Sequence, residues 1–187
     1  MPGEVFDVSL RPWTDADLTL LERLLGDPAM TVHLGGPESP EEIRWRHIGY
    51  LGVGDTSAGR MFAITAGPEQ LAVGSTGYWE VDRLGETVWE TGVSVLPEVQ
   101  GRGIATRAMV QIVERAAAEA WHGSIHAFPA VDNTPSNALC RSAGFTLFGP
   151  CEYEYPAGHV MHCNDWAVTF PTAANAGRDG RPGIVTS

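Results

Sequence analysis

The chain has 187 residues, of which 43% are hydrophobic and 19% are charged, a composition typical of one globular domain with a sizeable core. Its formal net charge is −11, which argues against a protein that binds nucleic acid through a basic surface. All 12 basic residues are arginines, so chemistry that depends on lysine, such as a Schiff base or a Walker phosphate loop, is excluded as well.

Targeting signals and metal-ligand spacings are not found in the sequence. There is no run of about 18 apolar residues that would span a membrane, and the N-terminus lacks the pattern of a secretory signal. The odd number of cysteines (Cys140, Cys151 and Cys163) favours free thiols in a cytoplasmic protein. The acidic balance would concentrate a cationic substrate, or it serves solubility alone.

Helix and strand patterns alternate along most of the chain. Residues 5–11 alternate as in a strand, and Thr14 is a typical N-cap for a helix over 14–26. Ser39-Pro40-Glu41-Glu42 is typical of a second helix start, and that helix is predicted over 40–51. The remaining predicted elements are strands at 60–66, 70–82 and 87–96, a helix at 102–121, a strand at 124–128, a helix at 135–143, and strands at 145–154 and 160–170.

This order, β-α-α-β-β-β-α-β-α-β-β, predicts a single mixed α/β domain over residues 1–171. No internal repeat and no linker divides it. Residues 172–187 are small and polar, and we expect them to be a disordered tail.

Two glycines, Gly101 and Gly103, stand between the strand at 87–96 and the helix that follows. Glycine permits a sharp turn and a close approach of ligand to backbone, and a helix start offers unpaired N–H groups to an anion. Arg102 could add charge-assisted bonds to a phosphate. A Rossmann loop would need a third glycine where Thr106 stands, so the pair by itself also fits a tight turn with no ligand.

The surroundings of these glycines carry a family resemblance. Gln100, Gly103 and Ala105 meet the pattern Gln/Arg-x-x-Gly-x-Gly/Ala, and the segment Asn133 to Phe145 is similar to a second landmark, Asn-x-x-Ser/Ala…Gly-Phe. Together they resemble the GNAT acetyltransferase superfamily. The Rim-type branch, which includes ribosomal-protein N-terminal acetyltransferases, is the most similar, through Glu90-Thr91-Gly92, Ser136 and Asp27-Pro28-Ala29-Met30.

This resemblance implies a single mixed, mostly antiparallel sheet flanked by helices and splayed at a slot for acetyl-CoA. It implies direct acetyl transfer to a primary amine of a small molecule or a peptide N-terminus. The acetyl-CoA contacts carried over are Val93, Val95, Gln100, Gly101, Arg102, Gly103, Ile104, Ala105, Thr106 and Asn133.

The catalytic residues expected are Glu90 as general base and Ser136 near the leaving thiolate. Glu90 lies in an otherwise apolar strand, and burial raises the pKa of a carboxyl toward useful values. Many members of the superfamily place a tyrosine acid where this chain has Cys140, so tyrosine catalysis from that position is in doubt. Glu80 and His126 are the alternative bases. The candidate substrate contacts are His33, Tyr78, Glu80 and His126. Further candidates for the wall of the substrate site are Trp45, Trp79, Tyr153 and Tyr155.

Other hypotheses stay open beside this one. A GNAT fold could bind acyl-CoA as a sensor or partner subunit without turnover. A metal site is not expected, because His159 and His162 have neither helical spacing nor a third ligand. The strands at 145–170 could pair across a homodimer.

Overall fold

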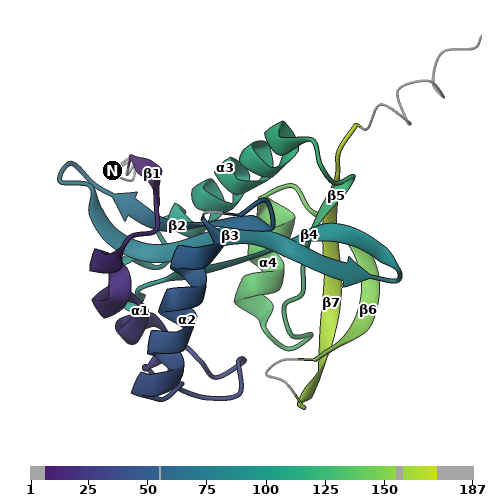
Figure 1. Cartoon of the computed structure of the whole chain (residues 1–187). Helices are drawn as coiled ribbons and strands as arrows, with labels where there is room; N and C mark the ends of the chain where they lie inside the picture. The colour runs from purple at the N-terminus through teal and green to yellow at the C-terminus, as the bar shows by residue number, and fades with distance from the viewer. Residues whose placement is uncertain (1–6, 55, 155–157, 172–187) are drawn as a thin grey trace, which may run out of the picture.

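One seven-stranded sheet with helices on both faces forms the domain (Figure 1). The computed structural model describes residues 7–54, 56–154 and 158–171, so the predicted tail lies outside the described residues. The strand order is β1-β2-β3-β4-β5-β7-β6, and neighbours are antiparallel except β4 and β5. The predicted fold class and element order are confirmed. The elements are β1 (Val8–Pro12), α1 (Leu18–Leu25), α2 (Pro40–Val53), β2 (Gly59–Ala66), β3 (Leu71–Arg83), β4 (Glu86–Val95), α3 (Ile104–Glu119), β5 (Ser124–Ala127), α4 (Thr134–Ser142), β6 (Thr146–Glu154) and β7 (Val160–Thr169).

Two helices begin later than the sequence predicts. Thr14 does cap a helical turn, but residues 15–17 form a 3₁₀ turn and α1 starts only at Leu18. α3 starts at Ile104 because Gly103 adopts a left-handed conformation with φ of 73°, which a right-handed helix cannot include.

Asp17 closes the turn before α1, and its side chain is only 3% exposed. Its carboxylate accepts hydrogen bonds from the two terminal guanidinium nitrogens of Arg11 at 3.0 and 2.6 Å and from the Thr14 N–H at 2.8 Å. Burial alone would raise the pKa of Asp17, but these donors outweigh it and lower the pKa below the usual 3.8. The ionised carboxylate therefore stabilises the fold fully at pH values above the usual pKa of 3.8. This contribution to stability is lost as the pH falls through the lowered pKa of the folded protein.

We expect Asp17→Asn to lower the free energy of unfolding at pH 7 by about 1–3 kcal/mol, because charged hydrogen bonds are lost from a buried group. Urea denaturation at pH 7 and at pH 3 measures the difference from the wild type, which should shrink at the lower pH. The matched control is Asp15→Asn, which changes an exposed acid in the same turn. Equal losses in the two variants would contradict the role given to Asp17.

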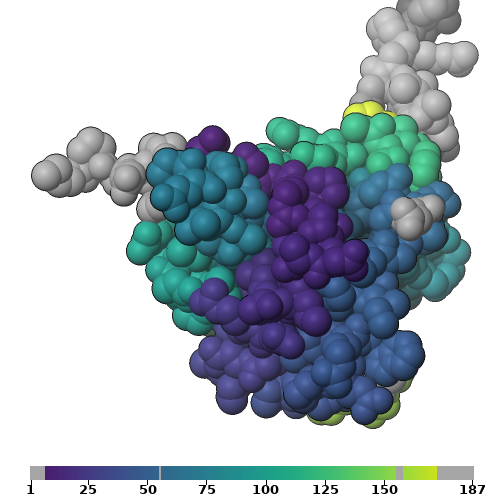
Figure 2. All heavy atoms as spheres, turned by 60° about the vertical axis from the view of Figure 1, so that its left-hand side comes forward, coloured from purple at the N-terminus to yellow at the C-terminus, as the bar shows by residue number. Residues whose placement is uncertain are grey.

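Two hydrophobic cores lie on opposite faces of the sheet. Trp89 and Ile125 pack under α3 and α4, and we call this side the α3 face. Met61 and Ala63 pack under α1 and α2, on the side that we call the α1 face. Figure 2 shows α1, the loop after it and α2 as one continuous surface, and the second core lies beneath it.

The sheet is interrupted between β4 and β5. These strands pair only where Trp89 lies beside Ile125 and Glu90 beside His126. β4 continues to Val95 and β5 ends at Ala127, with no further pairing between them. The predicted splay is therefore confirmed, and we call the opening beyond Glu90 the slot.

Candidate active site

A glycine loop connects the end of β4 to α3. Gly101 and Gly103 have φ values of 74° and 73°, and a Cβ at either position would meet no atom within 4 Å. Glycine is therefore required here by the backbone conformation, and the space above the loop is open. The first turn of α3 carries no acidic residue, whereas that of α2 carries Glu41 and Glu42. The partial positive charge of the α3 N-terminus is thus left for an external anion.

The other loop residues that the sequence singles out lie around this N-terminus. Ile104 has a buried side chain, so it offers only its backbone N–H. Ala105 and Thr106 follow in the first turn of α3. Arg102 donates to the carbonyl of Glu98 at 3.2 Å, which holds its guanidinium beside the loop.

The edge of β4 in the slot presents backbone groups of Val93 and Val95. The N–H of Leu96 donates to Val73 in β3, and successive residues of a strand point their backbone groups to opposite sides. Val93 and Val95 therefore face away from β3, toward the slot. The side chain of Gln100 donates to the Val95 carbonyl at 2.9 Å and links the glycine loop to this edge.

Glu90 lies where the slot begins, on the α1 face, and is 8% exposed. Burial raises the pKa of its carboxyl, and hydrogen bonds from Tyr153 and Trp79 offset part of that rise. The Tyr153 hydroxyl donates to Glu90 Oε2 at 2.6 Å. No arginine or histidine forms an ion pair with Glu90 among the described residues. The carboxylate is thus positioned but not neutralised.

An aromatic stack stands beside Glu90. The ring of Tyr153 stacks on Phe128 with centroids 4.8 Å apart, and Phe128 stacks on His126 at 5.9 Å. The stack joins β6 to the end of β5 and holds the Tyr153 hydroxyl against the carboxylate. Phe128 was not singled out by the sequence analysis, because its position becomes distinctive only once β6 is placed.

His126 belongs to a chain of polar contacts behind this stack. Nδ1 lies 2.6 Å from Oδ1 of Asp165, and Nε2 lies 3.0 Å from the Ser124 hydroxyl. Arg83 donates to the other Asp165 oxygen at 2.9 and 2.8 Å. Both ring nitrogens are occupied, so His126 would have to break a contact before it could take a proton from an amine.

The family follows from a comparison of the sequence with known families. Residues 7–146 match the model described as an acetyltransferase (GNAT) domain. The chain belongs to the GNAT acetyltransferase family. It is therefore an N-acetyltransferase, with acetyl-CoA as the acetyl donor. No curated protein sequence matches it.

Solved structures with the same fold include three acetyltransferases. The Salmonella typhimurium acetyltransferase that modifies the N-terminal serine of ribosomal protein L7/L12 has 22% identity and a TM-score of 0.73, covering 88% of this chain and 95% of its own. The Vibrio cholerae spermidine N-acetyltransferase, solved with CoA and spermine, has 19% identity and a TM-score of 0.70, with 87% and 95% covered. The aminoglycoside acetyltransferase AAC(6′)-Ib, solved with coenzyme A, has 18% identity and a TM-score of 0.69, with 87% and 95% covered.

The residues of this GNAT enzyme fit the donor. In the loop at 101–106, both glycines have the positive φ that the turn requires, and the space above them is open. The first turn of α3 has no acidic residue, so its N–H groups are suited to bind a pyrophosphate. The backbone of Val93 and Val95 can pair with the pantetheine arm as an added strand would. When acetyl-CoA is bound, its thioester supplies the acetyl group, and the residues of the chain hold the donor in position.

Asn133 and Ser136 lie together at the start of α4. The Asn133 side chain caps the helix by accepting a hydrogen bond from the Ser136 N–H at 3.2 Å. The Asn133 oxygen is therefore engaged in the helix cap, while its amide nitrogen forms no hydrogen bond with the residues that the structure describes. The Ser136 hydroxyl forms no hydrogen bond with the residues that the structure describes, so it is free to donate to a ligand.

Tyr78 and Glu80 lie on the face opposite Glu90, so the GNAT structure does not bring them to the slot. Trp79 is the register partner of Glu90, and alternation places its neighbours in β3 on the α3 face. Tyr78 is buried there and donates to Glu119 at 3.0 Å, while Glu80 contacts His122 at 2.9 Å. The prediction that both residues contact the substrate is therefore corrected, and so is the prediction that Glu80 is an alternative base.

His33 lies in the loop between α1 and α2. Its Nδ1 is 3.4 Å from Oδ1 of Asp132, in the segment between β5 and α4. In the same loop, Met30 contacts the Gln100 side chain at 3.4 Å. The α1–α2 loop therefore reaches both the glycine loop and the segment before α4, which keeps His33 as a candidate acceptor contact.

Cys140 is buried in the α3-face core, and burial raises the pKa of its thiol to about 12. It therefore packs as a small hydrophobic residue and stays protonated. Tyr155 lies outside the described residues. In the described part of the chain, no group of three or more His, Cys, Asp or Glu side chains is arranged to hold a metal ion.

Proposed function

We propose that this enzyme transfers the acetyl group directly to a neutral primary amine, on a small molecule or a peptide N-terminus. Glu90 is the general base and Ser136 stands beside the leaving thiolate. One observation carries the proposal: a buried carboxyl with a raised pKa lies where β4 and β5 part, and it forms no ion pair with any residue that the structure describes. A base works best when its pKa approaches the working pH.

The chain's own residues divide the work of such a transfer. Glu90 takes the proton of the incoming amine, and Tyr153 fixes the carboxylate through its 2.6 Å hydrogen bond. Ser136 is positioned to donate a hydrogen bond to the thiolate as it leaves. The Glu90 side chain faces the α1 face, so the acceptor enters from under the α1–α2 loop.

The acceptor class is tested by thiol release from acetyl-CoA across a panel of amines. The panel holds a peptide with N-terminal serine, spermidine, an aminoglycoside and free amino acids. A Rim-type enzyme, as we propose from the resemblance at Glu90 and Ser136, should prefer the peptide. If no amine in the panel causes thiol release but CoA still raises the thermal stability of the protein, the alternative of a non-catalytic acyl-CoA sensor is favoured.

We expect Tyr153→Phe to move the acid limb of the pH–rate profile to higher pH. The Tyr153 hydroxyl lowers the pKa of Glu90, so its removal lets burial raise that pKa further. The variant should lose more activity at pH 6 than at pH 9, measured as kcat/KM for the preferred amine. An equal loss at both pH values would mean that Tyr153 acts on the acceptor and not on the base.

We further propose a cytoplasmic location, supported by the three free cysteines, Cys140, Cys151 and Cys163. No helix in the described ranges is long and apolar enough to cross a membrane. We also propose a homodimer through β6, which is an edge strand with exposed Leu147 and Phe148. Sedimentation equilibrium would contradict it by reporting a monomer.

A further inference from the structure

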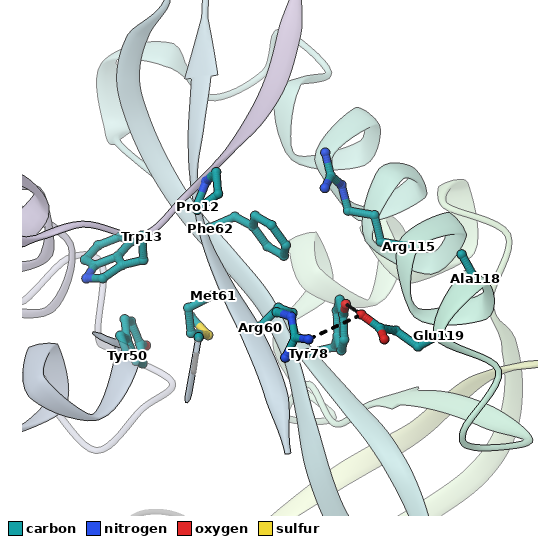
Figure 3. Close-up of a pocket in the computed structure, with 11 residues that line it drawn as sticks. Pro12, Trp13, Tyr50, Arg60, Met61, Phe62, Tyr78, Arg115, Ala118 and Glu119 are labelled. Atoms are coloured by element: carbon teal, nitrogen blue, oxygen red, sulfur yellow. Dashed lines mark hydrogen bonds and ion pairs between the residues drawn. The ribbon is translucent and has the colours of Figure 1, made fainter. Parts of the chain in front are cut away.

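A second cavity lies away from the slot, at the other end of α3. It has a volume of about 590 Å³, within the range of small-molecule sites. It forms where β1 ends at Pro12 and leaves the first residues of β2 uncovered, between the C-terminal ends of α2 and α3 (Figure 3). Since α3 has 16 residues, its two ends are about 24 Å apart, and the cavity is separate from the glycine loop.

Aromatic side chains form the walls. Trp13 and Tyr50 meet edge to face at 5.3 Å, and Phe62 and Tyr78 lie 6.4 Å apart. Hydrogen bonds fix two of these rings: the Trp13 indole donates to His47 at 3.0 Å and the Tyr78 hydroxyl donates to Glu119 at 3.0 Å. The walls are therefore preorganised for a flat, apolar body.

Three charged groups line the cavity, and two of them are already engaged. Arg60 donates to the carbonyls of Thr56 and Gly59 and lies 3.9 Å from Glu119. Arg115 is different: its guanidinium lies over the Phe62 ring at 4.9 Å and has no hydrogen bond or ion pair with the residues that the structure describes. Figure 3 shows it projecting from α3 toward the sheet.

We propose that this cavity binds a small aromatic monocarboxylate. A planar guanidinium held over a ring matches a planar carboxylate with two parallel hydrogen bonds. Arg60 and Arg115 against Glu119 give the lining a net charge of +1, in a chain whose net charge is −11. Glu119 repels a second negative charge, so a dianion such as a phosphate monoester is disfavoured.

The test is isothermal titration of the full chain with 1-naphthoate, 1-naphthamide and 1-naphthyl phosphate, with saturating CoA present. Naphthoate should bind at least about tenfold more tightly than the neutral amide, which has the same shape but no charge. Naphthyl phosphate should bind more weakly than naphthoate. Glu119→Gln should reduce this difference in affinity, because it removes the negative charge that repels the phosphate.

Arg115→Ala should weaken naphthoate binding by about tenfold or more, and Arg115→Lys should retain part of the affinity. The matched control is Arg141→Ala, since Arg141 is also an exposed helix residue over an aromatic ring, at 5.4 Å from Trp166. It should leave binding unchanged. No binding at millimolar naphthoate, equal binding of the amide, equal losses in the two alanine variants, or binding that occurs only when CoA is left out would each overturn the proposal. Because the readout is binding and not turnover, it is independent of the acetyl-transfer assay.

Discussion

Replacing Glu90 with glutamine is expected to lower kcat by about 10²- to 10⁴-fold, the usual contribution of a general base. Glutamine keeps the size of the side chain and can still accept from Tyr153, but it cannot take a proton. The KM for acetyl-CoA should hardly change, because the glycine loop lies beyond the far end of β4. Steady-state kinetics with the preferred amine measures both constants.

The pH dependence adds a second readout for the same residue. Because burial raises the pKa of Glu90 above the usual 4.5, wild-type kcat/KM should fall on the acid side at a pH above that value. This limb should vanish in Glu90→Gln.

Glu80→Gln is the control for Glu90→Gln, since it changes the same kind of residue in the neighbouring strand, on the opposite face. Its kcat should stay within about threefold of the wild type, as expected for a residue without a catalytic role. A Glu90→Gln variant with full turnover would move the base to a water or to His126.

Gly103→Ala is expected to weaken CoA binding by about tenfold or more while costing only about 1 kcal/mol of stability. The φ of 73° is unfavourable for alanine, so the loop would turn its N–H groups away from the pyrophosphate. In addition, the added Cβ would point into the open space that we assign to the phosphates. Isothermal titration with CoA and urea denaturation separate the two effects.

Gly85→Ala supplies the control for the backbone term. Gly85 has a φ of 84° in the turn between β3 and β4, and a Cβ there would also meet no atom within 4 Å. Its substitution should lower stability by a similar amount and leave CoA binding intact. If both variants bind CoA as the wild type does, the glycine loop is a turn without a ligand.

The local features of the site could be read from the sequence because each depends on neighbours in the chain. The glycine loop shows itself by its residues and by the change from strand to helix periodicity, and Glu90 by its place among apolar residues. The contact between Glu90 and Tyr153 joins residues 63 positions apart, and no periodicity reports a pairing across three strands.

Tyr78 and Glu80 were wrongly predicted as substrate contacts because the pairing of their strand with β4 was not worked out. Alternation puts them on one face of β3, but whether Glu90 shares that face depends on the register of β3 and β4. A signal for that register was present: Leu84-Gly85 makes a two-residue turn that pairs Arg83 with Glu86, and counting back from that pair brings Trp79 opposite Glu90.

The short pairing of β4 with β5 has a consequence for the protein when the donor is scarce. A sheet joined by two residue pairs has an open strand edge in its interior, from 91 to 95, and exposed edges recruit strands from other chains. A bound pantetheine arm would cover that edge and, at a hundredfold excess over its Kd, add about 2.7 kcal/mol to the free energy of unfolding. We therefore expect the supply of donor to protect the chain from aggregation, so that the enzyme is longest-lived when it has substrate to consume.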